Sequence, residues 1–239
     1  ALLASPARHA PRRENGGGMA SPARLARALR APWEIRPGSL AAAVLPAGRV
    51  PTASIGAPFV ALFGAGWPDA DLRLVAVGLD SGRRTVFDGR SAPRVSVGAA
   101  VEASCAIPAF FAPVEINGVR YVDGGIHSTT NADVVRTDRP DLVIVSAPMS
   151  AVRNAPFTAD VAVRQVARLA LGREVTGLRR RGCEVVTFQP TAADLEVMRG
   201  DSMNAEKMAP VLARVRETAS ARLADDDVRR RLALSLVSV

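Results

Sequence analysis

Apolar and polar positions along the chain predict strands that alternate with helices. Residues 72–78 form an apolar, β-branched run that is typical of a strand, and residues 85–87 form a second one. Residues 142–147 are almost continuously apolar, as expected of a strand that is covered on both faces. Because the run at 184–188 has the same character, we expect the strands at 72–78, 142–147 and 184–188 to lie in one sheet.

Helical patterns fill most of the sequence between and after these strands. Their ends are marked by proline before or after a pattern, by small residues and by amphipathic spacing. The helices are predicted at 22–30, 37–45, 54–65 (packing inward), 97–104, 158–181, 204–224 and 226–236. Strands that alternate with helices indicate a layered α/β sheet fold.

A β-hairpin is predicted just after the helix at 97–104. The β runs at 114–116 and 119–122 are separated only by Asn117-Gly118. Asparagine and glycine both tolerate a positive φ, so this pair is the strongest short hairpin signal in the chain.

Residues 5–24 are rich in proline, glycine, alanine and arginine, which predicts a flexible loop. The triple glycine at 16–18 has neither a strand before it nor a Gly-Lys-Ser/Thr sequence after it. It therefore does not fit a phosphate-binding loop.

The composition is that of a globular domain with a large excess of arginine. Hydrophobic residues make up 48% of the 239 residues, the formal charge is +8, and Lys207 is the only lysine. A codon bias of a GC-rich genome explains this composition, and attraction to an anionic surface, through runs such as 179–181 and 229–231, is the functional alternative. No stacking aromatic residues accompany these runs, so nucleic acid is not an expected partner.

The cysteine content indicates neither a zinc site nor a disulfide framework. Cys105 and Cys183 are isolated, and Cys105 is expected to be a buried core thiol. A reducing, cytoplasmic location is therefore expected, with peripheral membrane contact if the charge is functional. No apolar run reaches the roughly twenty residues that cross a bilayer.

The most informative chemistry lies where the second hairpin strand ends. Asp123 follows Tyr121-Val122 and enters Gly124-Gly125, so a carboxylate would be presented at a sheet rim with clear space around it. The alternative is that Asp-Gly-Gly is only a turn, because turns favour the same residues.

The surrounding motifs resemble the second conserved block of patatin-like phospholipases. They are Ser104-Cys105-Ala106-Ile107-Pro108, Phe111-Ala112-Pro113, the Gly-x-x-Tyr-x-Asp-Gly-Gly sequence at 118–125, and Asn131-Ala132-Asp133. The resemblance implies a three-layer α/β/α hydrolase that acts on lipids or phospholipids without a metal or organic cofactor. It also implies that Asp123 is the base of a Ser-Asp dyad and that Gly124 and Gly125 complete its motif.

The scarcity of histidine agrees with a dyad. The only histidines are His9, in the predicted loop, and His127, which is expected to be an exposed loop residue. A Ser-His-Asp triad would need one of them beside the nucleophile. Asp133 is expected to be a helix-cap or turn carboxylate.

The sequence departs from the family pattern at the nucleophile. No Gly-x-Ser-x-Gly occurs, and the nearest sequence, at 52–56, has Thr52 in place of the first glycine, so Ser54 is not expected to be a nucleophile. We therefore expect residues 1–239 to be the carboxy-terminal part of a single patatin-like domain that begins just after the missing serine, through truncation or degeneracy. Such a chain would be inactive alone. The alternative is a catalytically inactive domain that binds lipid or a partner.

Overall fold

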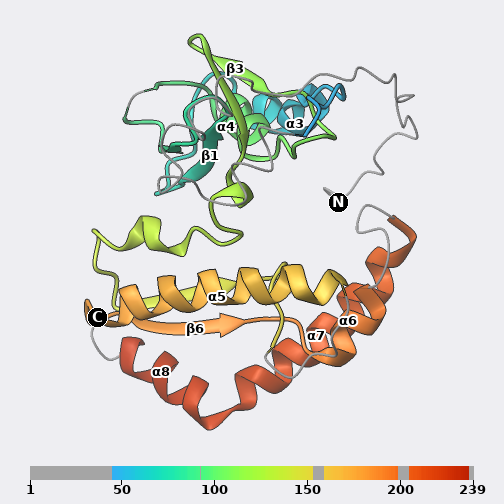
Figure 1. The fold of residues 1–239 in the computed structure, drawn as a ribbon. Helices are drawn as coiled ribbons and strands as arrows, with labels where there is room; N and C mark the ends of the chain where they lie inside the picture. The colour runs from blue at the N-terminus through green and yellow to red at the C-terminus, as the bar shows by residue number, and fades with distance from the viewer. Residues whose placement is uncertain (1–44, 92, 153–158, 199–204, 237–239) are drawn as a thin grey trace, which may run out of the picture. The chain divides into compact units, whose positions relative to one another are not determined.

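The computed structural model describes residues 45–91, 93–152, 159–198 and 205–236. Its contacts divide the chain into two compact units, Ala1–His127 (unit 1) and Ser128–Val239 (unit 2). Each unit is drawn with its elements in Figure 1. The loop predicted at 5–24 and the helices predicted at 22–30 and 37–45 lie outside the described residues, except for residue 45.

Unit 1 is built on an antiparallel sheet with the order β2-β1-β4-β3. The strands are β1 (Leu74–Gly78), β2 (Arg84–Phe87), β3 (Val114–Ile116) and β4 (Val119–Asp123). β1 is the central link, because it pairs with β2 on one edge and with β4 on the other.

The hairpin between β3 and β4 confirms the Asn-Gly prediction. Ile116 pairs with Val119, and the two linking residues Asn117 and Gly118 have φ values of 52° and 74°. Both therefore lie in the left-handed region that a two-residue hairpin turn of this kind requires.

Helix α4 (Val97–Ser104) has the predicted bounds and covers one face of this sheet. The Ser96 side chain caps it by accepting the Ala99 N–H at 3.2 Å. Its small residues allow close approach, so Ala100 and Ala103 are fully buried against Phe87 and other core residues of β1, β3 and β4.

Helix α3 (Ala53–Phe63) confirms the predicted helix at 54–65, but the prediction that it packs inward is wrong. Gly56 is its only buried residue, and Leu62 is 61% exposed. The helix meets α4 through glycine: a Cβ on Gly98 would lie 2.5 Å from Val60. Contact through small residues leaves most of its large apolar side chains outside the core.

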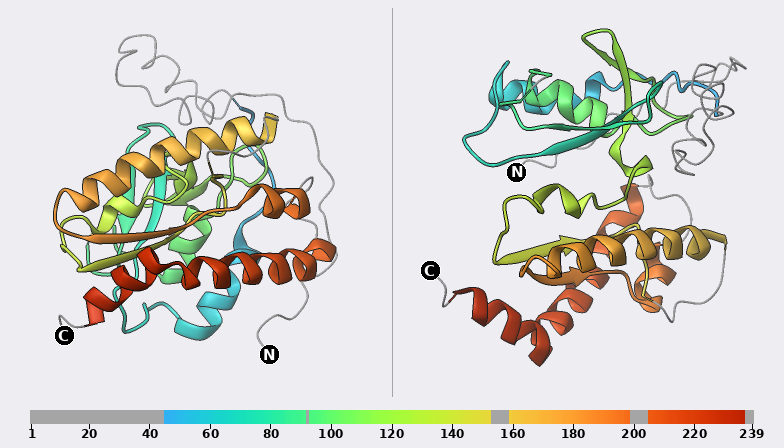
Figure 2. Two further views of the ribbon diagram at one scale, coloured as in Figure 1. Left: turned by 90° about the horizontal axis from the view of Figure 1, so that it is seen from below. Right: turned by 60° about the vertical axis from the view of Figure 1, so that its left-hand side comes forward.

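Unit 2 is a parallel βα arrangement. Strands β5 (Leu142–Ser146) and β6 (Glu184–Phe188) pair in parallel, with α5 (Ala159–Arg179) on one face. Helix α8 (Asp226–Leu236) lies on the other face, as the two views of Figure 2 agree. Helices α6 (Ala192–Met198) and α7 (Met208–Ala224), with the short 3-10 helix η4 (Ala205–Lys207) before α7, complete the unit.

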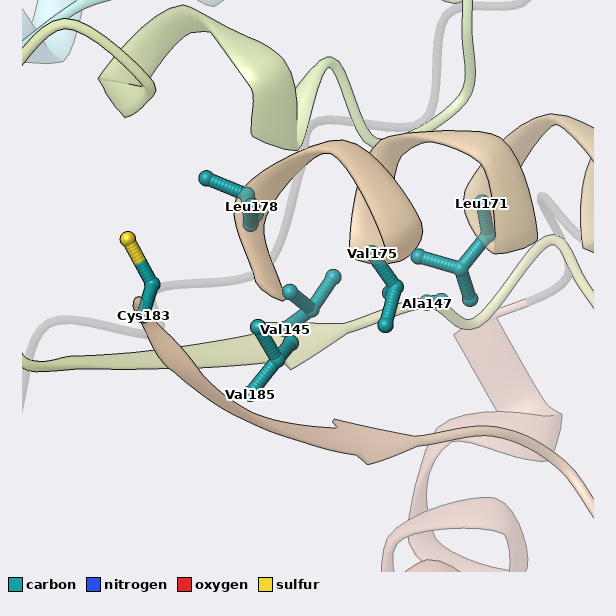
Figure 3. Close-up of a cluster of buried hydrophobic side chains, with 7 residues drawn as sticks. All are labelled: Val145, Ala147, Leu171, Val175, Leu178, Cys183 and Val185. Atoms are coloured by element: carbon teal, nitrogen blue, oxygen red, sulfur yellow. The ribbon is translucent and has the colours of Figure 1, made fainter. Parts of the chain in front are cut away.

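The core of unit 2 lies between α5 and the strands. Figure 3 shows Leu171 and Val175 of α5 directed toward the strands that carry Val145 and Val185, and Leu178 belongs to the same buried cluster. The cluster also contains Ala147 and Cys183, which is buried. The long amphipathic helix predicted at 158–181 is confirmed as α5, which packs an apolar side against the strands.

The mixed α/β character is confirmed, but the expectation of one sheet for the strands at 72–78, 142–147 and 184–188 is wrong. β1 belongs to the antiparallel sheet, and β5 and β6 form a sheet of their own in the described part of the chain. Both edges of β1 are already filled by β2 and β4, so it offers no edge to another strand. Helix α6 was not predicted, because seven residues are too few for helical periodicity to stand out.

Two leucines of α5 test this account of the unit 2 core. Leu178 is fully buried, whereas Leu169 is 55% exposed on the same helix. We expect Leu178→Ala to lower the free energy of unfolding by about 2–5 kcal/mol, because it leaves a cavity. Leu169→Ala, the matched control, should change it by less than about 1 kcal/mol in urea unfolding. Equal losses would contradict the assignment of the core.

Candidate active site

Asp123 is fixed by the backbone on both sides of it. It is the last residue of β4, where it pairs with Ala76 of β1. Its N–H donates to the carbonyl of Ala106 at 3.0 Å. The carboxylate is therefore placed by a sheet and by the loop after α4, rather than by a free turn.

The two glycines after Asp123 are required by close contacts. A Cβ on Gly124 would lie 2.3 Å from the carbonyl oxygen of Val75, which no real side chain could tolerate. A Cβ on Gly125 would lie 2.9 Å from Oδ1 of Asp123. Position 124 therefore needs glycine for the chain to turn away from β1, and a side chain at position 125 would displace the Asp123 carboxylate.

The carboxylate is held by its own turn. The N–H of Gly125 donates to Oδ1 of Asp123 at 2.6 Å, at the start of the 3-10 helix η2 (Gly124–Ile126). Burial raises the pKa of Asp123, and this hydrogen bond opposes the rise without cancelling it. Oδ1 is thus committed to orientation, and the group is a stronger base than an exposed aspartate.

Cys105 lies close enough to Asp123 to feel its charge. Burial raises the pKa of the Cys105 thiol, and the negative charge of Asp123 raises it further. The thiol therefore stays protonated and is a poor nucleophile. Cys105 is half-buried rather than the buried core thiol expected, because it ends α4 at the site instead of facing the core.

The spacing of residues in the sequence did not predict that Cys105 and Ala106 lie beside Asp123, because these residues are far apart along the chain. The motif at 104–108 contained the signal, because it belongs to the same family block as Asp123. No geometric role could be assigned to it before the hydrogen bond from Asp123 to Ala106 was seen.

His127 and Asp133, the two other polar residues of interest near the motif, each lie in or next to a short 3-10 helix. His127 is half-buried, not exposed as expected, and its N–H donates to the Gly124 carbonyl at 3.0 Å, which closes η2. Asp133 lies in the first turn of the 3-10 helix η3 (Ala132–Val135) in unit 2, as the interpretation as a turn or cap carboxylate predicts.

Ser54 does not occupy a nucleophile elbow. It is an exposed residue in the first turn of α3, after Thr52. The Thr52 hydroxyl donates to Glu102 of α4 at 3.0 Å, which ties this helix start to a neighbouring helix. A nucleophile elbow is instead a strained turn directly after a strand.

Within the described ranges, no group of three or more His, Cys, Asp and Glu side chains is placed to hold a metal ion. Among the same residues, no helix combines the length and hydropathy needed to cross a membrane.

The family is decided by comparison with known sequences. The model of the family described as Patatin-like phospholipase matches residues 4–136, which is more than half of the chain and includes Asp123 with both glycines. This chain belongs to the patatin-like phospholipase family. Lipid acyl hydrolysis is therefore its general family activity, with lipid as the substrate class. No curated protein sequence matches the chain.

The raised pKa of Asp123 has a consequence for stability. An acid whose pKa is higher in the folded state binds more protons there, so stability falls as pH rises from the unfolded-state pKa through the raised folded-state pKa. Asp123→Asn removes this loss, because the amide carries no charge to desolvate.

We therefore expect Asp123→Asn to match or exceed the parent in unfolding free energy at neutral pH, with the difference shrinking below pH of about 4. Urea unfolding across pH measures it. A variant much less stable than the parent at neutral pH would show that the carboxylate stabilises the fold instead.

Proposed function

We propose that this protein is a patatin-like lipid acyl hydrolase in which Asp123 is the base of a Ser-Asp dyad. The observation that supports it most strongly is the partly buried Asp123 carboxylate at the end of β4, with a raised pKa and an orienting hydrogen bond from Gly125. A base works best when its pKa approaches the working pH, and burial moves Asp123 in that direction.

In this mechanism, Asp123 accepts the proton of a serine hydroxyl as the serine oxygen attacks the acyl carbonyl. The tetrahedral intermediate collapses, the alcohol leaves with a proton from the Asp123 carboxyl, and an acyl-serine ester remains. Water then attacks this ester and loses a proton to Asp123, the serine oxygen takes that proton as it leaves, and the fatty acid is released. The reaction uses no metal and no organic cofactor.

The serine of this dyad is not assigned to any residue of the 239. The sequence contains no Gly-x-Ser-x-Gly, and in the described residues 45–53 before Ser54 the chain forms no named strand, with Val50 making only an isolated bridge to Phe111. We therefore propose that the nucleophile is supplied by a segment that is not in this sequence, and that the 239 residues alone do not hydrolyse esters.

We also propose that residues 1–239 belong to one patatin-like domain, part of a three-layer α/β/α architecture. The family match supports this, because it runs from residue 4 to residue 136 and so crosses the boundary between the units after His127. The parallel strands of unit 2, covered by α5 on one face and α8 on the other, have the layering expected of such a domain.

Peripheral contact with anionic membranes is proposed as the role of the arginine excess. The net charge is +8, and Arg180, Arg181, Arg229 and Arg230 are exposed on unit 2. Arg230 lies 3.8 Å from Asp227, and Arg231, which is less exposed, is paired with both Glu184 and Asp227. Vesicle binding should rise with anionic lipid and fall with salt, since exposed charges are screened within about 10 Å at 0.1 M. Equal binding to neutral vesicles would contradict it.

The catalytic proposal is tested by adding the missing group. The chain alone should be inactive on fatty-acyl p-nitrophenyl esters. Fusion to the strand–Gly-x-Ser-x-Gly–helix segment of an active patatin-like enzyme should create hydrolysis. In that fusion, Asp123→Asn should lower kcat by roughly 10²–10⁴-fold, because an amide cannot take the serine proton.

The same fusion supplies matched controls. Asp133→Asn removes a carboxylate of the first turn of η3 and should change kcat much less. His127→Ala should also be mild if no histidine carries the proton. Activity that survives Asp123→Asn, or robust hydrolysis by the unmodified chain, would refute this mechanism.

A further inference from the structure

Unit 2 contains a cavity at the ends of its parallel strands. Its volume is about 630 Å³, which lies within the range of roughly 300–1,000 Å³ typical of small-molecule sites. Ser146 and Phe188, the last residues of β5 and β6, both line it. Ligands of α/β proteins bind beyond the carboxyl ends of parallel strands, so this is where a site is expected.

The remaining walls come from α6, α7 and the loops that leave the two strands. Figure 1 shows α6 and α7 beside the end of β6. Helix α7 buries none of its 17 residues, although its residues from 214 to 222 border the cavity. An amphipathic helix of a packed domain would close its apolar side onto the sheet, so α7 leaves space for something else.

The walls are largely apolar. Side chains from the strand ends, α6 and α7 contribute Pro148, Phe188, Pro190, Met198, Val215 and Ala219. Met198 adds a flexible, polarisable side chain that adapts to irregular ligands. An unfilled apolar cavity forfeits dispersion contacts that a hydrocarbon would restore.

The charged groups around the cavity are already paired with one another. Asp194 is only 1% exposed and accepts from the backbone and hydroxyl of Thr191 at 2.8 and 2.7 Å and from Thr218 at 2.7 Å. Arg214 lies 3.2 Å from Asp194 and 2.8 Å from Glu217.

Arg222, at the rim, lies 3.1 Å from Asp225. Asp194 and Glu217 share Arg214, and Arg222 pairs with Asp225, so neither of these two arginines is a free cation that could hold an anionic head group. The selectivity of the cavity for its ligand must therefore come from the apolar walls.

We infer that this cavity binds the hydrocarbon chain of a fatty-acyl lipid. The affinity depends on the length of that chain and not on the head group of the lipid. The choice of lipid among apolar ligands rests on the proposed function. Binding itself needs no catalytic serine, so it can be measured on the chain as it stands.

The experiment is calorimetric titration of the full chain with palmitate and octanoate, each below its critical micelle concentration, and with methyl palmitate, which forms no micelles, below its solubility limit. Palmitate and methyl palmitate should bind with similar affinity, because the head group is not read. Octanoate should bind at least about tenfold more weakly, since each buried methylene contributes about 0.8 kcal/mol. Binding should also show a negative heat-capacity change.

Two alanines of α7 provide a matched pair. Ala219 lines the cavity, whereas Ala213 is exposed on the same helix and does not. Ala219→Leu should weaken palmitate binding at least about tenfold by filling the space, and Ala213→Leu should leave it within about twofold, since leucine is tolerated in helices. Circular dichroism should show both variants folded. Val215→Thr, which adds a hydroxyl to the wall at nearly constant shape, should also weaken binding.

Absence of palmitate binding by the folded chain would overturn the inference. So would binding of palmitate but not of its methyl ester, or equal effects of Ala219→Leu and Ala213→Leu. The proposed function fails in a different way, because it predicts turnover by the serine-supplied fusion and loss of turnover in Asp123→Asn.

Discussion

The site depends on the close approach of Gly124 to the carbonyl of Val75, where a Cβ would lie only 2.3 Å from the oxygen. This contact lets β4 pair with β1 up to Asp123 and then turn away at once. The pairing with Ala76 and the hydrogen bond to Ala106 bring three segments together at one carboxylate. A larger residue at 124 would separate β4 from β1 and would move the proposed base with it.

The environment of Asp123 shows a compromise between stability and chemistry. Burial raises its pKa, which strengthens it as a base but costs free energy when it is ionised. The Gly125 N–H recovers part of that cost and fixes one oxygen. Burial and, after it, the charge of Asp123 raise the pKa of the Cys105 thiol and keep it protonated, so this sulfur does not compete as a nucleophile. Perturbed groups of this kind are typical of functional sites.

Local signals predicted the local elements well, and long-range pairing was the part that sequence could not supply. The Asn117-Gly118 turn acts within a few residues, as do the small residues and Pro108 that marked the helix at 97–104, so the hairpin and α4 were placed correctly. Whether β1 joins the sheet of β5 depends on which strands fill its edges, and spacing carries no such information. The apolar composition of α3 predicted a helix but not its exposure, because Gly56 forms its contact with α4. Asp123 was found from its motif, whereas its closeness to Cys105 and the cavity in unit 2 required the three-dimensional structure.

The central claim is that the fold holds Asp123 as a partly desolvated, oriented base. Carboxyl carbon-13 NMR on the chain labelled at aspartate tests it most directly, with Asp123→Asn used to assign the resonance. The account predicts that Asp123 titrates at a pKa above the ordinary aspartate value of 3.8. Titration at or below that value would show that the carboxylate is solvated or paired like a surface turn, and would contradict the account.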